Sequence, residues 1–201
     1  MFPPLTDFVA MLGINLVLCA GCLRLLSWKA ITRAWAKWLT AVFFVVLWLP
    51  LGAAQLPVVA YIRGISSDLS ITLVVMACVG LSHRVLGTPA ITGRERTAVL
   101  IAVSTAAVFL YPLALGWGDW DAYRPGWGST GMCLVLLLVS LVCWFKGLRL
   151  LPTLVALALL AWTAGVMESG NLWDYLIDPW LVMSALLFVL LKYIRLLFKT
   201  A

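Results

Sequence analysis

Apolar runs separated by short polar segments repeat along the whole chain. A transmembrane helix needs about 20 apolar residues, and somewhat fewer where the bilayer is thin. Seven runs approach this length, at residues 6–26, 38–60, 67–82, 97–115, 129–145, 152–167 and 179–198. The pattern therefore predicts an all-α fold, a polytopic bundle of about seven transmembrane helices that forms a single membrane domain over residues 1–201.

Proline and polar residues mark interruptions and starts within this pattern. Pro50 and Pro57 fall inside the second run, and each removes a backbone donor and clashes with the preceding turn, so we expect that helix to kink or unwind toward its later end. Ser66, Ser67 or Asp68 can cap the third helix. Asp178 followed by proline is typical of an N-cap with proline in the first turn, and it predicts the start of the last helix.

Composition places most of this apolar surface against lipid. Of the 201 residues, 64% are hydrophobic and 11% are charged, whereas soluble domains carry about 25% charged residues. A soluble fold of this size cannot bury so much apolar surface. The lipid bilayer is therefore the first expected partner.

The basic residues predict the orientation in the membrane. With seven spans, the predicted inner side holds twelve of the fourteen Lys and Arg residues: Arg24, Lys29, Arg33, Lys37, Arg84, Arg94, Arg96, Lys146, Arg149, Lys192, Arg195 and Lys199. This positive-inside bias predicts an N-terminus outside and a C-terminus in the cytoplasm. Short loops with such a bias are typical of a bacterial inner membrane. Because the basic residues mark topology and form no solvated patch, we expect no nucleic-acid partner.

The acidic residues segregate to the other side, and only Glu95 maps to the inner side. The insertion rule does not explain this, because acidic residues contribute little to topology. The predicted outer loops also carry Trp and Tyr side chains, and glycines that let the backbone approach a ligand. The candidate ligand-binding residues are Arg63, Asp68, Asp119, Trp120, Asp121, Tyr123, Arg124, Glu168, Asn171, Trp173, Asp174 and Asp178.

Several chemistries fit these loops. Aromatic faces beside carboxylates and an amide suit sugar rings, and the two arginines can hold a phosphate. Asp119 and Asp121 can bind a divalent cation such as Ca²⁺, but they lack the ordered ligands of an EF-hand. Structural roles are the alternative: helix caps, solvated charges, interfacial aromatics, and ion pairs of Arg63 with Asp68 or of Arg124 with Asp121.

Other sites lack the residues that they need. The single histidine, His83, argues against multi-histidine metal and haem sites. No nucleotide-binding glycine motif occurs. We interpret Cys19 and Cys22, a CxxC pair in an apolar run, as small buried side chains. We therefore expect neither a metal nor another cofactor.

Three functions remain open. The first is a non-catalytic cell-envelope accessory protein or subunit, whose acidic, Trp-rich outer loops bind a lipid-linked saccharide, a phospholipid or a partner membrane protein. The second is an outer-leaflet transferase in which paired carboxylates act on a lipid-phosphate-linked substrate. The third is a small-solute transporter, for which the interrupted second helix with Gln55 is the supporting feature.

Overall fold

A computed structural model describes residues 4–26 and 31–198 of the chain. The structure is 74% helical. Lys29 and Lys199, which we predict on the inner side, lie outside the described residues. The chain divides into two compact units. Unit 1 comprises Met1–Leu69, Leu73–Ile91 and Ala164–Glu168, and unit 2 comprises Ser70–Thr72, Thr92–Thr163 and Ser169–Ala201.

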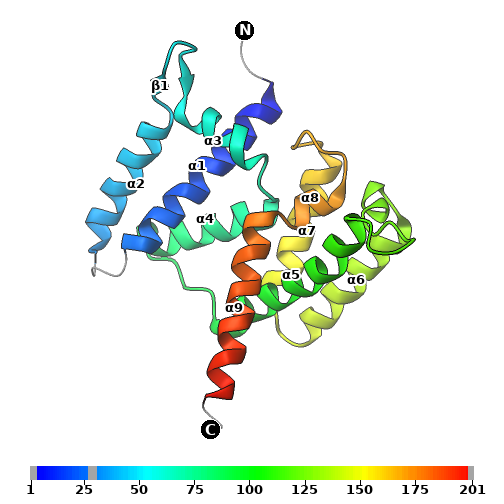
Figure 1. The fold of residues 1–201 in the computed structure, drawn as a ribbon. Coiled ribbons are helices and arrows are strands. Elements are labelled where there is room, and N and C mark those ends of the chain that lie inside the picture. Colours follow the sequence, from blue (N-terminus) through cyan, green and yellow to red (C-terminus); the bar gives the residue numbers. More distant parts are fainter. Residues whose placement is uncertain (1–3, 27–30, 199–201) are drawn as a thin grey trace. The chain divides into compact units, whose positions relative to one another are not determined.

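Unit 1 is built around its first helix. Its elements are α1 (Leu5–Leu26), α2 (Arg33–Leu47), β1 (Pro50–Leu51), β2 (Leu56–Pro57), α3 (Val58–Ser66) and most of α4 (Ile71–Leu86) (Figure 1). One apolar cluster contains Met11, Ile14, Leu47, Val59 and Leu69. A second cluster contains Cys19, Leu23, Ala36 and Leu81. Both clusters include residues of α1, so this helix is the core against which α2 and α3 pack.

Polar contacts join α1 to α2 within this apolar core. The Asn15 side-chain amide, fully buried, donates to the Phe44 carbonyl at 3.1 Å. The Cys19 thiol lies 3.4 Å from the Asn15 side-chain oxygen. Cys19 is therefore a buried packing residue that also donates to an amide, and both Cys19 and Cys22 are free thiols.

The second predicted span is not one helix. α2 ends at Leu47, and a two-stranded antiparallel hairpin follows, in which Pro50 pairs with Pro57 and Leu51 with Leu56. The chain then forms α3, a separate short helix. The prolines explain the interruption, because neither can donate the hydrogen bond that a continuing helix requires.

Unit 2 is an all-helical bundle. Its elements are α5 (Gly93–Ala114), the 3₁₀ helix η2 (Arg124–Trp127), α6 (Thr130–Phe145), α7 (Leu150–Thr163), α8 (Leu172–Leu176) and α9 (Pro179–Leu197). α5 packs against α9 and α7, while α6 packs against α7. Most helix bounds lie within a few residues of the apolar runs, because these runs have the length and the turn signals of helices.

Two adjacent charged residues cap the α6–α7 turn. Arg94 donates from Nη2 to the carbonyl of Lys146, the C-cap residue of α6, at 2.8 Å. Glu95 accepts from the backbone N–H groups of Arg149 and Leu150, at the start of α7, at 2.8 and 3.0 Å. A cation at a helix C-terminus and an anion at an N-terminus are both favourable. Glu95 therefore caps the start of α7, a role that its position in the sequence does not indicate.

Asp178 caps α9 as its sequence predicts, and Pro179 occupies the first turn. Its Oδ1 accepts from the Leu181 N–H at 2.9 Å, and its Oδ2 accepts from the N–H of Ser70 at 3.0 Å and from the Ser70 hydroxyl. The carboxylate is only 4% exposed. α4 begins at Ile71, so the proposed cap at Asp68 is wrong: the Asp68 carboxylate binds Arg63 instead.

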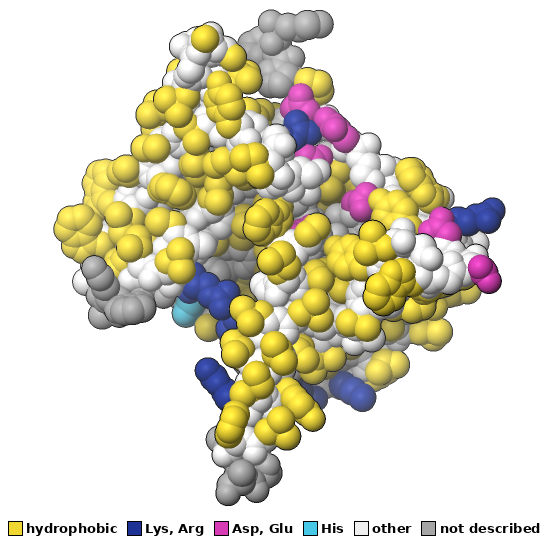
Figure 2. Space-filling view, in the orientation of Figure 1, with side chains coloured by type: hydrophobic (Ala, Val, Ile, Leu, Met, Phe, Trp, Pro, Cys, Tyr) yellow, Lys and Arg dark blue, Asp and Glu magenta, His cyan; other side chains and the backbone are white. Residues whose placement is uncertain are grey.

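The surface is strongly apolar, and hydrophobic side chains cover most of the face shown in Figure 2. Within the described residues, three helices are long and apolar enough to cross a membrane: Leu5–Leu26, Gly93–Ala114 and Pro179–Leu197. Three shorter apolar helices accompany them: Ile71–Leu86, Thr130–Phe145 and Leu150–Thr163. This composition fits a membrane protein.

Replacing Asp178 tests the buried cap. Asp178→Ala leaves the Ser70 and Leu181 donors without their acceptor, so we expect the free energy of unfolding to fall by about 2–4 kcal/mol. Unfolding in mild detergent, followed by helical circular dichroism, measures this change. Asp119→Ala, at an exposed position, is the control and should change stability by less than about 0.5 kcal/mol. Equal stability of the two variants would contradict the role of Asp178.

Candidate functional site

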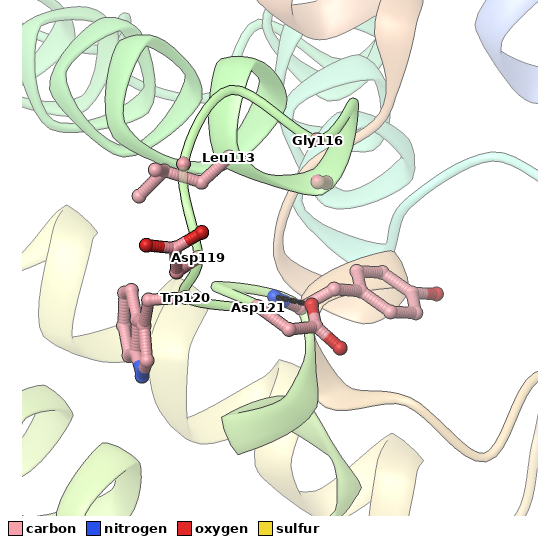
Figure 3. Close-up of a pocket in the computed structure, with 8 residues that line it drawn as sticks. Leu113, Gly116, Asp119, Trp120 and Asp121 are labelled. Atoms are coloured by element: carbon pink, nitrogen blue, oxygen red, sulfur yellow. Dashed lines mark hydrogen bonds between the residues drawn. The ribbon is translucent and has the colours of Figure 1, made fainter.

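A pocket of about 580 Å³ lies in unit 2, where α5 ends and a glycine-rich loop begins (Figure 3). It is lined by Leu113, Ala114, Gly116, Gly118, Asp119, Trp120, Asp121 and Tyr123. Gly116 and Gly118 adopt positive φ angles of 89° and 119°, which side chains other than glycine rarely adopt. These two turns bring Asp119 and Trp120 back beside the end of α5, and we call this site the loop pocket.

The two carboxylates of the loop pocket differ in their partners. Asp121 accepts from the backbone N–H groups of Tyr123 and Arg124 at 2.9 and 3.3 Å, so it shapes the turn. Asp119 has no hydrogen-bond partner among the described residues. Trp120 is 52% exposed and packs one side against Phe109, with ring centroids 5.5 Å apart. The pocket thus offers an unpaired carboxylate beside an accessible indole.

Side chains of residues 169–176 hold the pocket loop in place. The Tyr123 hydroxyl donates to Asp174 Oδ2 at 2.6 Å, and the Ser169 hydroxyl donates to the same oxygen. The Asn171 amide donates to the Tyr123 carbonyl at 3.0 Å. The Trp173 indole donates to the Ala122 carbonyl at 3.1 Å. The residues of this segment that make these bonds position the loop and do not line the pocket. Their partner Tyr123 does line it.

Close packing also fixes this contact. A Cβ atom on Gly126 would lie 1.8 Å from Asn171 Oδ1 and 2.7 Å from Trp173 Cδ1. Only glycine fits at such a distance. Asn171, which is fully buried, also caps α8 by accepting from the Trp173 N–H at 2.9 Å. Asn171 is therefore a structural residue.

The environment of Tyr123 favours its neutral form. Burial, followed by the hydrogen bond to Asp174 and the charge of that carboxylate, raises the pKa of the Tyr123 phenol above its ordinary value of 10.0. Ionised Tyr123 would place a negative charge against Asp174 and lose the hydrogen bond. The phenol is thus a permanent donor at neutral pH.

A second group of charges lies in unit 1, and we call it the Arg63 cluster. The Arg63 guanidinium donates from Nη1 to Asp7 at 2.7 Å, from Nε to Asp68 at 2.8 Å and from Nη2 to Glu168 at 2.9 Å. Three carboxylates and one guanidinium give this cluster a net charge of −2. The hydrogen bond to Asp68, followed by those to Asp7 and Glu168, raises the pKa of Arg63 against the opposing effect of burial. Each guanidinium nitrogen therefore already has a carboxylate partner.

The structure divides the predicted site residues among several places. Asp119, Trp120, Asp121 and Tyr123 line the loop pocket. Asn171, Trp173 and Asp174 hold its loop in place. Arg63, Asp68 and Glu168 belong to the Arg63 cluster, and Asp178 is a buried cap. Arg124 begins η2, and its backbone N–H, rather than its guanidinium, contacts Asp121.

Sequence reasoning missed three participants. Asp7 was assigned to the outer face but not to a site, although it binds Arg63. Ser169 and Tyr175 were not selected, and they hydrogen-bond within the 169–175 segment. Neither the residue type nor the spacing of these three residues predicts their contacts, because their partners are backbone groups or side chains that only the folded loops bring close. Among the described residues, no three His, Cys, Asp or Glu side chains group as metal ligands.

The helix lengths, the apolar surface and the loop pocket define a helical protein of membrane-spanning character with a candidate binding site in its unit 2 loops. Comparison with protein-family models, curated proteins and solved structures finds no match. Function must therefore be argued from the site itself.

The raised pKa of Tyr123 predicts a pH dependence of stability. A raised folded-state pKa contributes stability that is complete below the unfolded value, near 10.0, and is lost as pH rises through the folded value. Tyr123→Phe should be less stable than wild type at pH 8, and the difference should narrow above pH 10. Thermal unfolding at pH 8–11 measures it. Tyr193→Phe, at an exposed position, should follow wild type throughout; a Tyr123→Phe difference that is independent of pH would contradict the assignment.

Proposed function

We propose that this chain is a seven-span membrane protein, with its N-terminus outside and its C-terminus in the cytoplasm, that binds the saccharide headgroup of a lipid-linked ligand in the loop pocket. The protein acts as a non-catalytic accessory protein or subunit in a bacterial inner membrane. One observation carries the proposal: Asp119 and Trp120 lie together in the loop pocket without other polar partners among the described residues.

The chemistry of the loop pocket favours a polyhydroxylated ligand. A carboxylate accepts hydrogen bonds from two hydroxyl groups, and an indole face stacks on the C–H groups of a sugar ring. The volume of about 580 Å³ falls within the roughly 300–1,000 Å³ of ligand pockets. Backbone groups near Gly116 and Gly118 can approach the ligand closely because no side chain covers them.

The seven-span topology is supported by charge placement at helix ends. Arg24 lies in the last turn of α1, Arg84 in that of α4 and Arg195 in that of α9. Arg94 and Glu95 at the start of α5 bind the α6–α7 turn, so the turn shares the predicted cytoplasmic side. The Arg63 cluster and the loop pocket then lie on the outer side.

Pairing of the carboxylates favours binding over catalysis. Glu168 binds Arg63, and Asp174 accepts hydrogen bonds from Tyr123 and Ser169. Asp178 is a buried cap. For the transferase alternative, the carboxylate pair that remains in a pocket is Asp119 with Asp121. Of these, Asp121 already accepts a hydrogen bond from the backbone of the turn.

Reporter fusions test the topology. Alkaline phosphatase, which is active only outside the cytoplasm, is fused after residues 68, 118 and 169 and, separately, after residues 89, 147 and 198. We expect activity from the first set and none from the second, because basic loops stay inside. A green fluorescent protein fusion series, which reports the cytoplasmic side, provides the reciprocal control. Activity on both sides of the Thr130–Phe145 helix would contradict the seven-span arrangement.

Native mass spectrometry tests the ligand. The protein is purified in mild detergent from bacterial membranes, and bound lipids are released by activation and identified. We expect a glycolipid whose occupancy falls at least roughly tenfold in Trp120→Ala, since aromatic stacking contributes about 0.5–1.5 kcal/mol in addition to the burial of the indole surface. Trp117→Ala is the matched control, because Trp117 is 75% exposed in the same loop and does not line the pocket.

The same preparation distinguishes the alternatives. Glycolipid that is retained equally by both tryptophan variants would overturn the loop pocket as its site. Conversion of the bound glycolipid by wild type, and not by Asp119→Asn, would support a transferase instead. A co-purified protein that binds wild type and both variants equally would indicate a subunit whose contact surface lies elsewhere.

A further inference from the structure

The β1–β2 hairpin in unit 1 follows a helix that is too short to cross a membrane. α2 has 15 residues, about 22 Å at 1.5 Å per residue, whereas the hydrocarbon core is about 30 Å thick. The first turns of α2 carry Arg33 and Lys37, and the sequence then has no charged residue before Arg63. The apolar stretch therefore continues past the helix, through the hairpin and into α3.

The hairpin presents leucine side chains outward. Leu49, Leu51 and Leu56 are 49%, 53% and 47% exposed. This surface continues the exposed apolar side of α2, which includes Val45 at 58%, and Figure 1 shows the hairpin directly beyond the end of α2. In water these leucines would form an exposed apolar patch of the kind that marks an interaction surface.

We propose that the hairpin completes the second membrane crossing: its leucines contact lipid acyl chains in the leaflet remote from Arg33, and residues 52–55 reach the headgroups. Lipid is the occupant that the exposed side of α2 has in the proposed seven-span topology, and the hairpin extends that side without a charged residue before Arg63. This inference rests on that topology and does not depend on the loop pocket or its ligand.

Several backbone groups of the hairpin need no partner from water, which matters at membrane depth, where an unpaired N–H or C=O costs several kcal/mol. Pro50 and Pro57 have no N–H to satisfy. The Leu51 carbonyl accepts from the Tyr61 hydroxyl at 3.0 Å, and the Leu49 carbonyl accepts from the Val58 N–H at 3.2 Å. Side-chain and backbone donors thus replace the water that would normally satisfy an exposed turn.

The tip of the hairpin is closed in the same way. The Gly52 carbonyl accepts from the Gln55 backbone N–H at 3.3 Å and from the Gln55 side-chain amide at 3.0 Å. A Cβ atom on Gly52, which has φ of 68°, would lie 3.1 Å from the Tyr61 hydroxyl. Glycine at this position therefore leaves room for the Tyr61 hydrogen bond. Gln55 is the one polar side chain between Trp48 and Tyr61, which suits a tip at headgroup depth.

Photo-crosslinking from lipids tests the hairpin. The full chain is reconstituted in phosphatidylcholine nanodiscs that contain a lipid with a diazirine either near the acyl end or in the headgroup. After irradiation, adducts are mapped by mass spectrometry. We expect acyl adducts on Leu51 and Leu56 as well as on Val45 of α2, which is the internal control, and headgroup adducts on Ala53 and Ala54.

The test substitution is Tyr61→Phe, because it removes the hydroxyl that donates to the Leu51 carbonyl and keeps the aromatic ring. We expect acyl adducts on Leu51 to fall roughly tenfold as the unpaired carbonyl moves toward the headgroups, while those on Val45 stay unchanged. Tyr193→Phe should change neither. Acyl adducts on Val45 without any on Leu51 or Leu56 in wild type would overturn the proposal, as would crosslinks from the leucines to a second copy of this chain.

Discussion

The first N–H groups and the last C=O groups of a helix have no partner within the helix and must find one elsewhere. This constraint explains where three charged side chains of the chain are used. Asp178 closes the start of α9, Glu95 closes the start of α7, and Arg94 closes the end of α6. Each contact also complements the dipole of its helix. Three charged side chains of a very apolar sequence thus lie where the backbone of a helix end needs a partner.

Existing side-chain partners separate the acidic residues into structural and available groups. Asp7, Asp68 and Glu168 share one guanidinium, and Asp174 receives two hydroxyl donors. Among the described residues of the loop pocket, Asp119 has no such partner. The acidic, aromatic-rich loops therefore contain a much smaller candidate site, which offers one carboxylate and one exposed indole. Such a site favours ligand binding, because acid–base catalysis with two carboxylates requires that both be free to exchange protons.

Helix positions were largely predictable from the sequence, whereas the breaks between them were less so. The run at residues 6–26 corresponds to α1 and the run at 179–198 to α9, because apolar length and the Asp178–Pro179 start signal are local properties. Pro50 and Pro57 indicated an interruption, but the hairpin depends on Tyr61 and Val58, which satisfy its carbonyls from outside the turn. The role of Glu95 was not visible either, since its partners lie more than fifty residues away.

For the candidate site, residue types were predictable and their grouping was not. Aromatic and acidic loop residues could be selected by composition, yet their assignment to the loop pocket, to its supports or to the Arg63 cluster depends on contacts distant in sequence. Gly126 illustrates the point, because its lack of a side chain matters only once Asn171 lies against it. A pocket wall and its support then look alike in sequence, since both are polar loop residues beside aromatics. Among the pocket walls themselves, Asp121 and Tyr123 make hydrogen bonds, whereas Asp119 has no such partner among the described residues. This difference decides which carboxylate remains available to a ligand.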